Sequence, residues 1–436
     1  MRFHIEGGAR LQGTYVPQGA KNEALQIIAA ALLTAEPVEI QNLPDIRDVA
    51  RQLELVAYLG ASVERLDSHR VRIQAKDLEP RRLLLPEGRE LFRSIRGSVL
   101  IAGPLLARCG EAYLPRPGGD KIGRRRLDTH LLGLMQLGAT LSYEAKTETF
   151  HLAAPKRLRG RFLLLEEASV TGTANLLMAA ALAEGETVLY HAACEPYIQQ
   201  LGRFLRDLGV PIEGLGTNRL HVQGQQSLGG ATHRLLPDVI EIGSVIGLAA
   251  MTQSALRIAP VPVEHLGPIL HPFSRLGIPV SVEGETLAVD PPVIYQPDTL
   301  YEGEVLQISD HTWPGTPPDL LSVLLVVATQ AAGHVLIHQK MFESRLFFVD
   351  RLIEMGAQVV LCDPHRALVI GLGRRAPLRG IRMSSPDIRA GMALLIAALS
   401  AEGPSLIEQA DQIERGYERL HERLGALGAV IHREGD

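Results

Sequence analysis

The chain has 436 residues, of which 46% are hydrophobic and 4% aromatic, and its formal net charge is −5. This length exceeds what one hydrophobic core usually serves, so we expect two domains. The hydrophobic content excludes a disordered chain, and the acidic balance gives no basic footprint for nucleic acid. The separated Cys109, Cys194 and Cys362 favour neither a disulfide framework nor a zinc site.

The sequence contains no feature of a secreted, membrane-spanning or cofactor-binding protein. Residues 1–6 are charged and lack an apolar signal core, and the most apolar runs, 98–107 and 320–332, are shorter than a membrane span. No HExxH, Walker loop or GxGxxG after a strand occurs. We therefore expect a cytoplasmic protein with no metal, no cofactor, no nucleic-acid partner and no membrane partner.

Along the chain, a charged amphipathic segment followed by a Leu-Gly or Met-Gly pair recurs. Each such pair, called a glycine step here, predicts a helix that is ended by the glycine and followed by a strand of alternating apolar and polar residues. The steps lie roughly 70–80 residues apart, a spacing that indicates internal duplication. They occur at Leu59-Gly60, Leu137-Gly138, Leu208-Gly209, Leu276-Gly277, Met355-Gly356 and Leu427-Gly428.

Between these steps lies a second recurring element, a small-residue apolar helix that leads into a strand. Helices of this composition are buried on most sides. The segments are 21–43, 94–114, 169–190, 241–258, 318–337 and 387–407. The pattern predicts six α/β (α+β) units, three of which close around their buried helices to form each of two similar domains, with a cleft between the domains.

The order of these elements predicts a discontinuous first domain. The strands expected at residues 3–5 and 11–16 precede the first unit, and a boundary is expected near residues 235–238. We therefore predict one domain of residues 1–20 with 237–436, and a second of residues 21–236 that carries a mobile loop at 114–126. Two proline-rich and charged segments, 77–88 and 291–302, are expected to be loops.

Residues 116–130 concentrate groups that recognise anions. Gly118, Gly119 and Gly123 allow close backbone approach to a ligand, and the neighbouring arginines offer forked donors for phosphate or carboxylate. Asp120 lies alone among these cations. The alternative is a solvated basic loop, and this segment by itself does not decide between the two.

The chain resembles the enolpyruvyl transferases, and specifically the UDP-N-acetylglucosamine 1-carboxyvinyltransferases, over almost its whole length. The resemblance begins with Gly-Ala-Lys-Asn at 19–22; the related shikimate-pathway enzyme would be expected to show a serine-lysine pair there and fits less well. Matching motifs continue, in order, at 35–44, 94–98, 117–123, 128–130, 169–173, 195–196, 236–238, 318–319, 342–345, 387–389 and 413–417.

This resemblance implies both a fold and a reaction. The fold would be two domains, each an inside-out α/β barrel of three repeated units, with a cleft that closes when the nucleotide sugar binds. The reaction would transfer the enolpyruvyl group of phosphoenolpyruvate to the 3-hydroxyl of UDP-N-acetylglucosamine and release phosphate. That is the first committed step toward the peptidoglycan precursor.

The resemblance also implies residue roles. Asp319 would be the base near the sugar hydroxyl, Asp120 the acid in the loop, and Lys21 and Arg415, also counted as catalytic, part of the phosphoenolpyruvate clamp. The substrate-binding set would be Lys21, Asn22, Arg96, Arg125, Arg126, Leu127, Asp128, Thr129, Ser169, Val170, Thr171, Asp319, Met341, Arg345, Asp387, Arg389 and Arg415.

For each of these roles a structural alternative exists. An aspartate after two prolines is commonly a helix N-cap, which is the alternative for Asp319. Arginines are mostly exposed surface cations, which is the alternative for the clamp. Three further positions resemble residues that support the family's site but are equally compatible with ordinary structural roles: His130, Glu195 and Asp238.

Asp120 is the main departure from the family, because most members have a cysteine in the loop. Members with aspartate there are active and escape the covalent antibiotic fosfomycin, since a carboxylate lacks the soft thiolate nucleophile that opens the epoxide. An aspartate beside Lys121 and two arginines holds a proton poorly at neutral pH. We therefore expect a rate optimum at more acidic pH than in cysteine-containing members.

Three smaller departures concern charged positions. The family commonly has proline at position 126, lysine at 47 and aspartate at 414, where this chain has Arg126, Arg47 and Glu414. They leave room for a paralogue that acts on another acceptor, including the shikimate intermediate. A separate alternative is a catalytically silent relative that binds a nucleotide sugar, against which the retained Asp319, Lys21 and arginine cluster argue.

Overall fold

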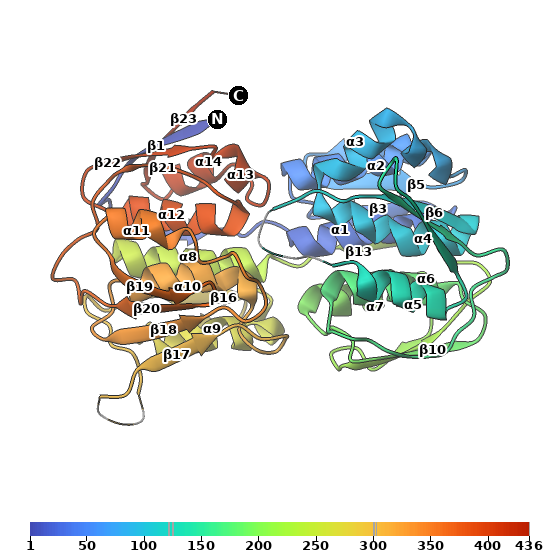
Figure 1. Ribbon diagram of the computed structural model, residues 1–436. Coiled ribbons are helices and arrows are strands. Elements are labelled where there is room, and N and C mark those ends of the chain that lie inside the picture. Colours follow the sequence, from blue (N-terminus) through green and yellow to red (C-terminus); the bar gives the residue numbers. More distant parts are fainter. Residues whose placement is uncertain (121–122, 124–125, 300, 302, 436) are drawn as a thin grey trace. The chain divides into compact units, whose positions relative to one another are not determined.

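The computed structural model describes residues 1–120, 123, 126–299, 301 and 303–435 (Figure 1). The described residues divide into two compact units. Unit 1 contains residues 1–18 and the described part of 237–435, and unit 2 contains residues 19–120 and 126–236. These divisions fall after Gln18 and Leu236, whereas the sequence placed the boundaries after residues 20 and 236.

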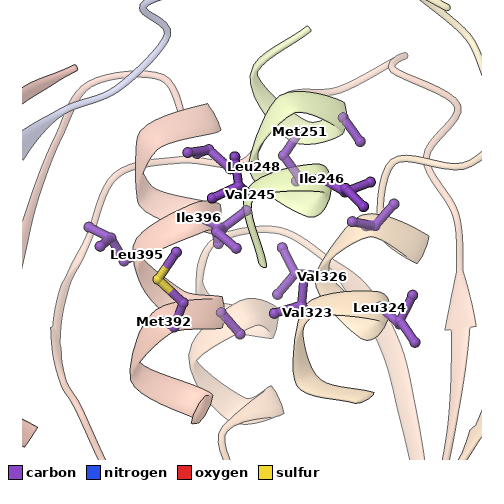
Figure 2. Packing of buried hydrophobic residues seen from close by; sticks show 14 of the residues in the cluster. Val245, Ile246, Leu248, Met251, Val323, Leu324, Val326, Met392, Leu395 and Ile396 are labelled. Atoms are coloured by element: carbon purple, nitrogen blue, oxygen red, sulfur yellow. The ribbon is translucent and has the colours of Figure 1, made fainter. Parts of the chain in front are cut away.

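Three apolar helices form the centre of unit 1: α8 (Val239–Thr252), α10 (Leu321–Ala328) and α12 (Ile388–Ser400). They pack against one another, and every residue except the last of α12 is buried. Figure 2 shows aliphatic and methionine side chains of the three helices meeting in this core. Even so, no helix that the structure describes is both long and apolar enough to cross a membrane.

Three four-stranded sheets accompany these helices, with strand orders β21-β22-β1-β23, β15-β16-β14-β2 and β17-β18-β20-β19. In each sheet, one edge strand is parallel to its neighbour and the other pairings are antiparallel. The strands are β1 (Arg2–Glu6), β2 (Gly13–Tyr15), β14 (Leu256–Ile258), β15 (Val280–Glu283), β16 (Thr286–Val289), β17 (Leu306–Ser309), β18 (His334–His338), β19 (Gln358–Asp363), β20 (Arg366–Ile370), β21 (Arg382–Ser384), β22 (Pro404–Glu408) and β23 (Val430–Glu434).

Unit 2 repeats this plan around α1 (Lys21–Ala30), α4 (Ala102–Cys109) and α6 (Val170–Ala181), with short 3-10 helices η1 (Ala31–Leu33) and η3 (Arg96–Ile101). Its sheets have the orders β11-β12-β10-β9, β13-β3-β5-β4 and β6-β8-β7, and the last of these departs from the plan because it has three strands, all antiparallel. The strands are β3 (Val38–Gln41), β4 (Ser62–Asp67), β5 (Arg70–Gln74), β6 (Glu111–Pro115), β7 (Thr140–Glu144), β8 (Thr149–Ala153), β9 (Phe162–Leu164), β10 (Glu186–Tyr190), β11 (Ile212–Glu213), β12 (Arg219–Gln223) and β13 (Ala231–Arg234).

The repeated glycine steps are confirmed. Each follows an outer helix and adopts a left-handed φ between 82° and 111°, which glycine reaches at little cost. The six outer helices are α2 (Arg47–Tyr58), α5 (Asp128–Gln136), α7 (Pro196–Asp207), α9 (Gly267–Arg275), α11 (Val349–Glu354) and α14 (Leu420–Gly425). Further short elements are η4 (Val263–His265), η5 (Pro318–Leu320) and α13 (Asp411–Glu414). Together the two units form the α/β fold of paired three-unit barrels that the sequence predicted.

One loop prediction is wrong. Residues 77–88 contain η2 (Pro80–Leu84) and the start of α3 (Pro86–Ser94). Both helices begin with proline, which fits the first helical position because its missing N–H would have no helical partner there. The described residues of the other proline-rich segment, 291–302, form neither helix nor strand, as expected.

Gly103 tests how closely the central helices of unit 2 pack. A Cβ atom at this position of α4 would lie 2.2 Å from the backbone oxygen of Asn175 in α6, so one helix must shift. We expect Gly103→Ala to destabilise the chain by about 1–3 kcal/mol, measured by urea unfolding. The matched control is Gly425→Ala, where no atom lies within 4 Å of the new Cβ. Equal unfolding midpoints for the two variants would contradict the prediction.

Candidate active site

Within each unit, several predicted site residues lie at the amino-terminal ends of the central helices. A helix N-terminus carries unsatisfied N–H groups and a partial positive charge, so it favours polar and anionic partners. In unit 2 these positions are occupied by Lys21 at α1, Arg96 at η3 before α4, and Ser169 at α6; in unit 1 by Asp238 at α8, Asp319 before α10, and Asp387 at α12.

In unit 1, two arginines hold Asp319. Arg345 donates from Nη2 to Oδ1 at 2.7 Å, and Arg389 donates from Nε to Oδ2 at 3.1 Å. The side chains of Arg345 and Arg389 are only 12% and 8% exposed, so water screens these charges little. Among the described residues, neither η5 nor α10 has a side-chain cap, so the N-cap alternative for Asp319 is wrong.

Asp387 and Asp238, in contrast, are N-caps. Asp387 accepts hydrogen bonds from the backbone N–H groups of Arg389 and Ala390 at 2.8 and 3.0 Å. Asp238 caps α8 in the same way, with bonds of 2.9 and 3.3 Å. Such caps stabilise a helix by about 1 kcal/mol. The cap at Asp387 also fixes the backbone from which Arg389 projects.

Arg389 makes a second contact, to the buried hydroxyl of Tyr417. Its Nη1 donates to that hydroxyl at 3.0 Å, and Ser244 of α8 lies 3.0 Å from the same oxygen. Burial opposes the charge of Arg389, but the oxygens of Tyr417 and Asp319 outweigh it and raise the pKa of the guanidinium. For the Tyr417 phenol, burial disfavours the anionic form and raises the pKa. The sequence did not assign a role to Tyr417, although motif 413–417 contains it.

Two other predicted residues of unit 1 have different neighbours. Arg415 follows α13 and donates from Nη1 to Gln412 at 2.9 Å. Met341 is half-exposed, and its backbone N–H donates to Asp310 at 3.2 Å. Glu414 lies with Oε1 3.5 Å from Nε of Arg433.

In unit 2, Lys21 forms a buried ion pair at the start of α1. Its Nζ lies 2.7 Å from Oδ2 of Asp48 in α2, and the two side chains are 9% and 5% exposed. The pair fixes the position of the ammonium group, and the next residue, Asn22, is half-buried. Asp48 was missed by the sequence reasoning, because nothing in the local pattern of α2 identifies which cation it meets.

His130 lies in a buried chain of hydrogen bonds that defines its tautomer, here called the His130 relay. Asn175 must donate from Nδ2 to Nδ1 of His130 at 2.8 Å, because its oxygen already accepts from the backbone of Gly103. The proton of His130 therefore resides on Nε2 and is donated to the hydroxyl of Thr171 at 3.1 Å. Burial, reinforced by the charge of Arg96, lowers the pKa of His130 to about 3.

This relay leaves the hydroxyl hydrogen of Thr171 available as a donor, because its oxygen accepts from His130. Nearby, Ser169 caps α6 by accepting from Gly172 at 3.2 Å, and Val170 is the first residue of that helix. Thr129 of α5 donates to Glu167 at 3.4 Å. Backbone N–H groups at helix starts of this kind suit phosphate groups, and the diphosphate contacts expected here stay a prediction.

Before α5, the side chains are more exposed. Arg126 pairs through Nε with Asp128, the first residue of α5, and is 77% exposed. Leu127 occupies the N-cap position of α5 without a side-chain cap. Elsewhere in the chain, Glu195 holds the N-cap position of α7 and Arg47 is the exposed first residue of α2.

The described part of the predicted loop follows β6. A Cβ at Gly118 would lie 1.8 Å from the backbone oxygen of Arg93, and Gly119 has a φ of 101°, so both positions require glycine. Asp120 is half-buried. The predicted ligand Arg125, with Lys121 and Arg124, lies outside the described residues. No group of histidine, cysteine and acidic side chains in the described part of the chain forms a metal site.

Comparison with known proteins identifies the class. The sequence profile described as EPSP synthase (3-phosphoshikimate 1-carboxyvinyltransferase) matches residues 5–424. A solved structure titled as the enolpyruvyl transferase NikO from Streptomyces tendae superposes with a TM-score of 0.86 at 25% identity, over 99% of this chain and 98% of that one. The chain therefore belongs to the EPSP synthase family of enolpyruvyl transferases.

Within that family, the chain is similar over its whole length to curated relatives that share one name. It is 55% identical to the UDP-N-acetylglucosamine 1-carboxyvinyltransferase of Porphyromonas gingivalis, over 99% of both chains. It is 52% identical to the protein of the same name from Bacteroides thetaiotaomicron, again over 99% of both. The family resemblance inferred from the sequence is thus confirmed.

The buried neutral His130 predicts a pH dependence of stability. Its pKa falls from an ordinary 6.5 to about 3 on folding, so the unfolded chain binds more protons between these values. The stability contributed by neutral His130 is therefore present above pH 6.5 and lost as the pH falls. The stability advantage of the parent over His130→Gln should shrink by about 1.4 kcal/mol per pH unit below 6.5.

Urea unfolding at several pH values measures this difference. The matched control is His432→Gln, which replaces an exposed histidine on β23 and should leave the slope unchanged. Parallel stability curves for the parent and His130→Gln would show that His130 is not held neutral by folding.

Proposed function

We propose that the chain transfers the enolpyruvyl group of phosphoenolpyruvate to the 3-hydroxyl of UDP-N-acetylglucosamine, releasing phosphate. The 55% and 52% identical relatives carry the name of this activity over their full lengths. The reaction is the first committed step toward the peptidoglycan precursor, and we assign it to the cytoplasm. It needs two small-molecule substrates and no cofactor.

The chemistry requires a base and an acid. The sugar hydroxyl loses a proton as its oxygen bonds to C2 of phosphoenolpyruvate, while C3 gains a proton and becomes a methyl group. The tetrahedral adduct then loses a proton from C3 and phosphate from C2, which restores the double bond. We assign the base to Asp319 and the acid to Asp120.

The contacts of Asp319 are the observation that carries this assignment. Its carboxylate is not used as a helix cap but is held by Arg345 and Arg389, both largely buried. Two guanidinium groups at this point favour the anionic form of Asp319 and offer forked donors to an anionic substrate. We assign Lys21, Arg415 and Arg125 to the phosphoenolpyruvate clamp.

For the nucleotide sugar, we assign the helix starts of unit 2. Asn22 and Arg96 belong to this set, with Ser169, Val170 and Thr171 at the start of α6. Backbone N–H groups at helix starts suit a diphosphate. The set also includes Arg126, Leu127, Asp128 and Thr129 from unit 2, and Met341 and Asp387 from unit 1.

Phosphate release from phosphoenolpyruvate tests the function and separates it from the alternatives. Release that requires UDP-N-acetylglucosamine supports the proposal. Release only with another acceptor, such as the shikimate intermediate, would indicate a paralogue. A folded protein that binds the nucleotide sugar but releases no phosphate would be a silent relative.

Replacing the proposed base should remove turnover without removing substrate binding. We expect Asp319→Asn to lower kcat by about 10²–10⁴-fold, because the amide cannot accept the hydroxyl proton. The matched control is Asp363→Asn, which breaks a different aspartate–arginine pair, with Arg366, at the β19–β20 turn. Phosphate release measures kcat, and calorimetry measures UDP-N-acetylglucosamine affinity. Full activity in Asp319→Asn would eliminate it as the base.

With aspartate as the loop acid, we also propose insensitivity to fosfomycin. The epoxide of that antibiotic needs a thiolate, and Cys109 lies outside the loop in α4. Burial raises the pKa of both the Cys109 and the Cys194 thiols, which disfavours their thiolate forms. Neither thiol is suited to replace the missing loop cysteine.

The variant Asp120→Cys should reverse both properties. We expect it to become inactivated by fosfomycin and to shift the optimum of phosphate release toward higher pH, because a thiol keeps its proton at neutral pH whereas a carboxylate does not. Time-dependent inactivation and pH–rate profiles of the parent and the variant measure these effects. A variant profile that overlays the parent would rule out Asp120 as the acid.

A further inference from the structure

Gln18 is a buried glutamine that the proposed function does not explain. It is 6% exposed and is the last residue of unit 1 before the chain enters unit 2. Its backbone N–H donates to Glu241 at 2.7 Å, and its backbone oxygen accepts from Asp238 at 2.9 Å. Both backbone groups of Gln18 are therefore fixed to the start of α8.

The side-chain amide of Gln18 brackets one residue of a distant segment. Its Nε2 donates to the backbone oxygen of Gly416 at 2.8 Å, and its Oε1 accepts from the backbone N–H of Glu418 at 2.7 Å. The first partner can only accept and the second can only donate, so the orientation of the amide is determined. The amide pairs with the backbone on both sides of Tyr417.

Gly416 is confined from the other side as well. A Cβ at this position would lie 2.4 Å from Cγ2 of Ile388, the first residue of α12. Gly416 therefore packs closely against α12 and is also bonded to the amide of Gln18. These contacts restrain the neighbouring Tyr417, whose hydroxyl meets Nη1 of Arg389.

Glu241 and Arg423 add further hydrogen bonds to this arrangement. The buried carboxylate of Glu241 accepts from Tyr15 at 2.8 Å and from Nη1 of Arg423 at 2.7 Å, in addition to the backbone of Gln18. The same Nη1 donates to the backbone oxygen of Glu418 at 3.1 Å. Because these polar groups satisfy one another, the buried network is rigid.

We propose that Gln18 is a positioning residue for the reaction, acting through Tyr417 and Arg389 on the orientation of Asp319. The inference rests on the proposed function and deepens it. No atom of Gln18 needs to touch a substrate. Its amide fixes the backbone of Tyr417, the Tyr417 hydroxyl fixes one arm of Arg389, and another nitrogen of Arg389 holds Oδ2 of Asp319.

The first test removes the two hydrogen bonds of the Gln18 amide while keeping the size of the side chain. Gln18→Met should lower kcat by about 10–100-fold and change each KM by less than about threefold, because a small misplacement of a reacting group costs that much in rate. The matched control is Gln330→Met, since Gln330 is also buried in unit 1 but its amide makes no hydrogen bond among the described residues. An equal loss in both variants would overturn the proposal.

A double-mutant cycle tests the route. Tyr417→Phe removes the hydroxyl that Arg389 contacts and should lower kcat to a similar extent. If Gln18 acts through Tyr417, the double variant should lose no more than the larger single loss. Losses that multiply would mean that Gln18 acts by another route, which contradicts the proposal.

Gln18→Glu gives a pH-dependent rescue that a general loss of packing would not give. A protonated carboxyl group has one donor and one acceptor and can replace the amide, whereas the ionised form cannot donate to Gly416. Two charged side chains bond to this region: Glu241 accepts from the backbone N–H of Gln18, and Arg423 donates to Glu241 and to the backbone oxygen of Glu418. The kcat of Gln18→Glu relative to the parent should therefore rise as the pH falls; a ratio that does not change with pH would overturn the proposal.

Hydrogen exchange keeps the test independent of the reaction. The amide of Glu418, which donates to Oε1 of Gln18, should exchange at least tenfold faster in Gln18→Met than in the parent or in Gln330→Met. Unchanged exchange would overturn the positioning role even if kcat fell. If the parent is inactive but the Glu418 amide still exchanges faster in Gln18→Met, the proposed function is overturned. The hydrogen bonds of Gln18 to Gly416 and Glu418 would nevertheless be established.

Discussion

The close packing of three apolar helices in each unit is the constraint on which the rest of the structure depends. Helices such as α8 and α12 are buried on nearly all sides, so most of their polar contacts lie near their ends. Their amino-terminal N–H groups must be satisfied there, because leaving them buried and unpaired would cost about 1–3 kcal/mol each. Polar residues are therefore required at the same places where a substrate anion would be attracted.

The three aspartates of unit 1 show how one position serves two purposes. Asp238 and Asp387 bond to backbone N–H groups and stabilise their helices. Asp319 occupies the corresponding place before α10, but there Pro317 and Pro318 lead into the short η5 and the carboxylate lies within that turn. Because it is not used as a cap, its two oxygens are available to Arg345 and Arg389.

The sequence was sufficient for the repeated architecture because that architecture is encoded locally. A glycine after an amphipathic helix and a run of small apolar residues each report on neighbouring positions, and the glycines of all six steps have the expected left-handed φ. The loop prediction for residues 77–88 failed because proline both breaks and begins helices, and composition does not distinguish the two uses.

The partners of the site residues could not be predicted in the same way. Lys21 meets Asp48, and His130 meets Asn175, across separations that only the packed helices bring together. The motifs located Lys21, Asp319 and Arg389 in the sequence, but not the hydroxyl of Tyr417 between Arg389 and Ser244. Pairing between buried polar groups depends on tertiary packing, which a local pattern does not contain.

The ion network around Asp319 links stability to the proposed chemistry. A guanidinium buried as deeply as Arg389 would cost several kcal/mol without a counter-charge, and Asp319 and Asp238 both supply negative charge to it, so Asp319 contributes to the stability of unit 1 before any substrate arrives. A substrate phosphate or carboxylate that reached Arg345 and Arg389 would compete with Asp319 for their hydrogens. The carboxylate oxygens released in this way could then accept the hydroxyl proton, so that binding of the anion itself would prepare the base.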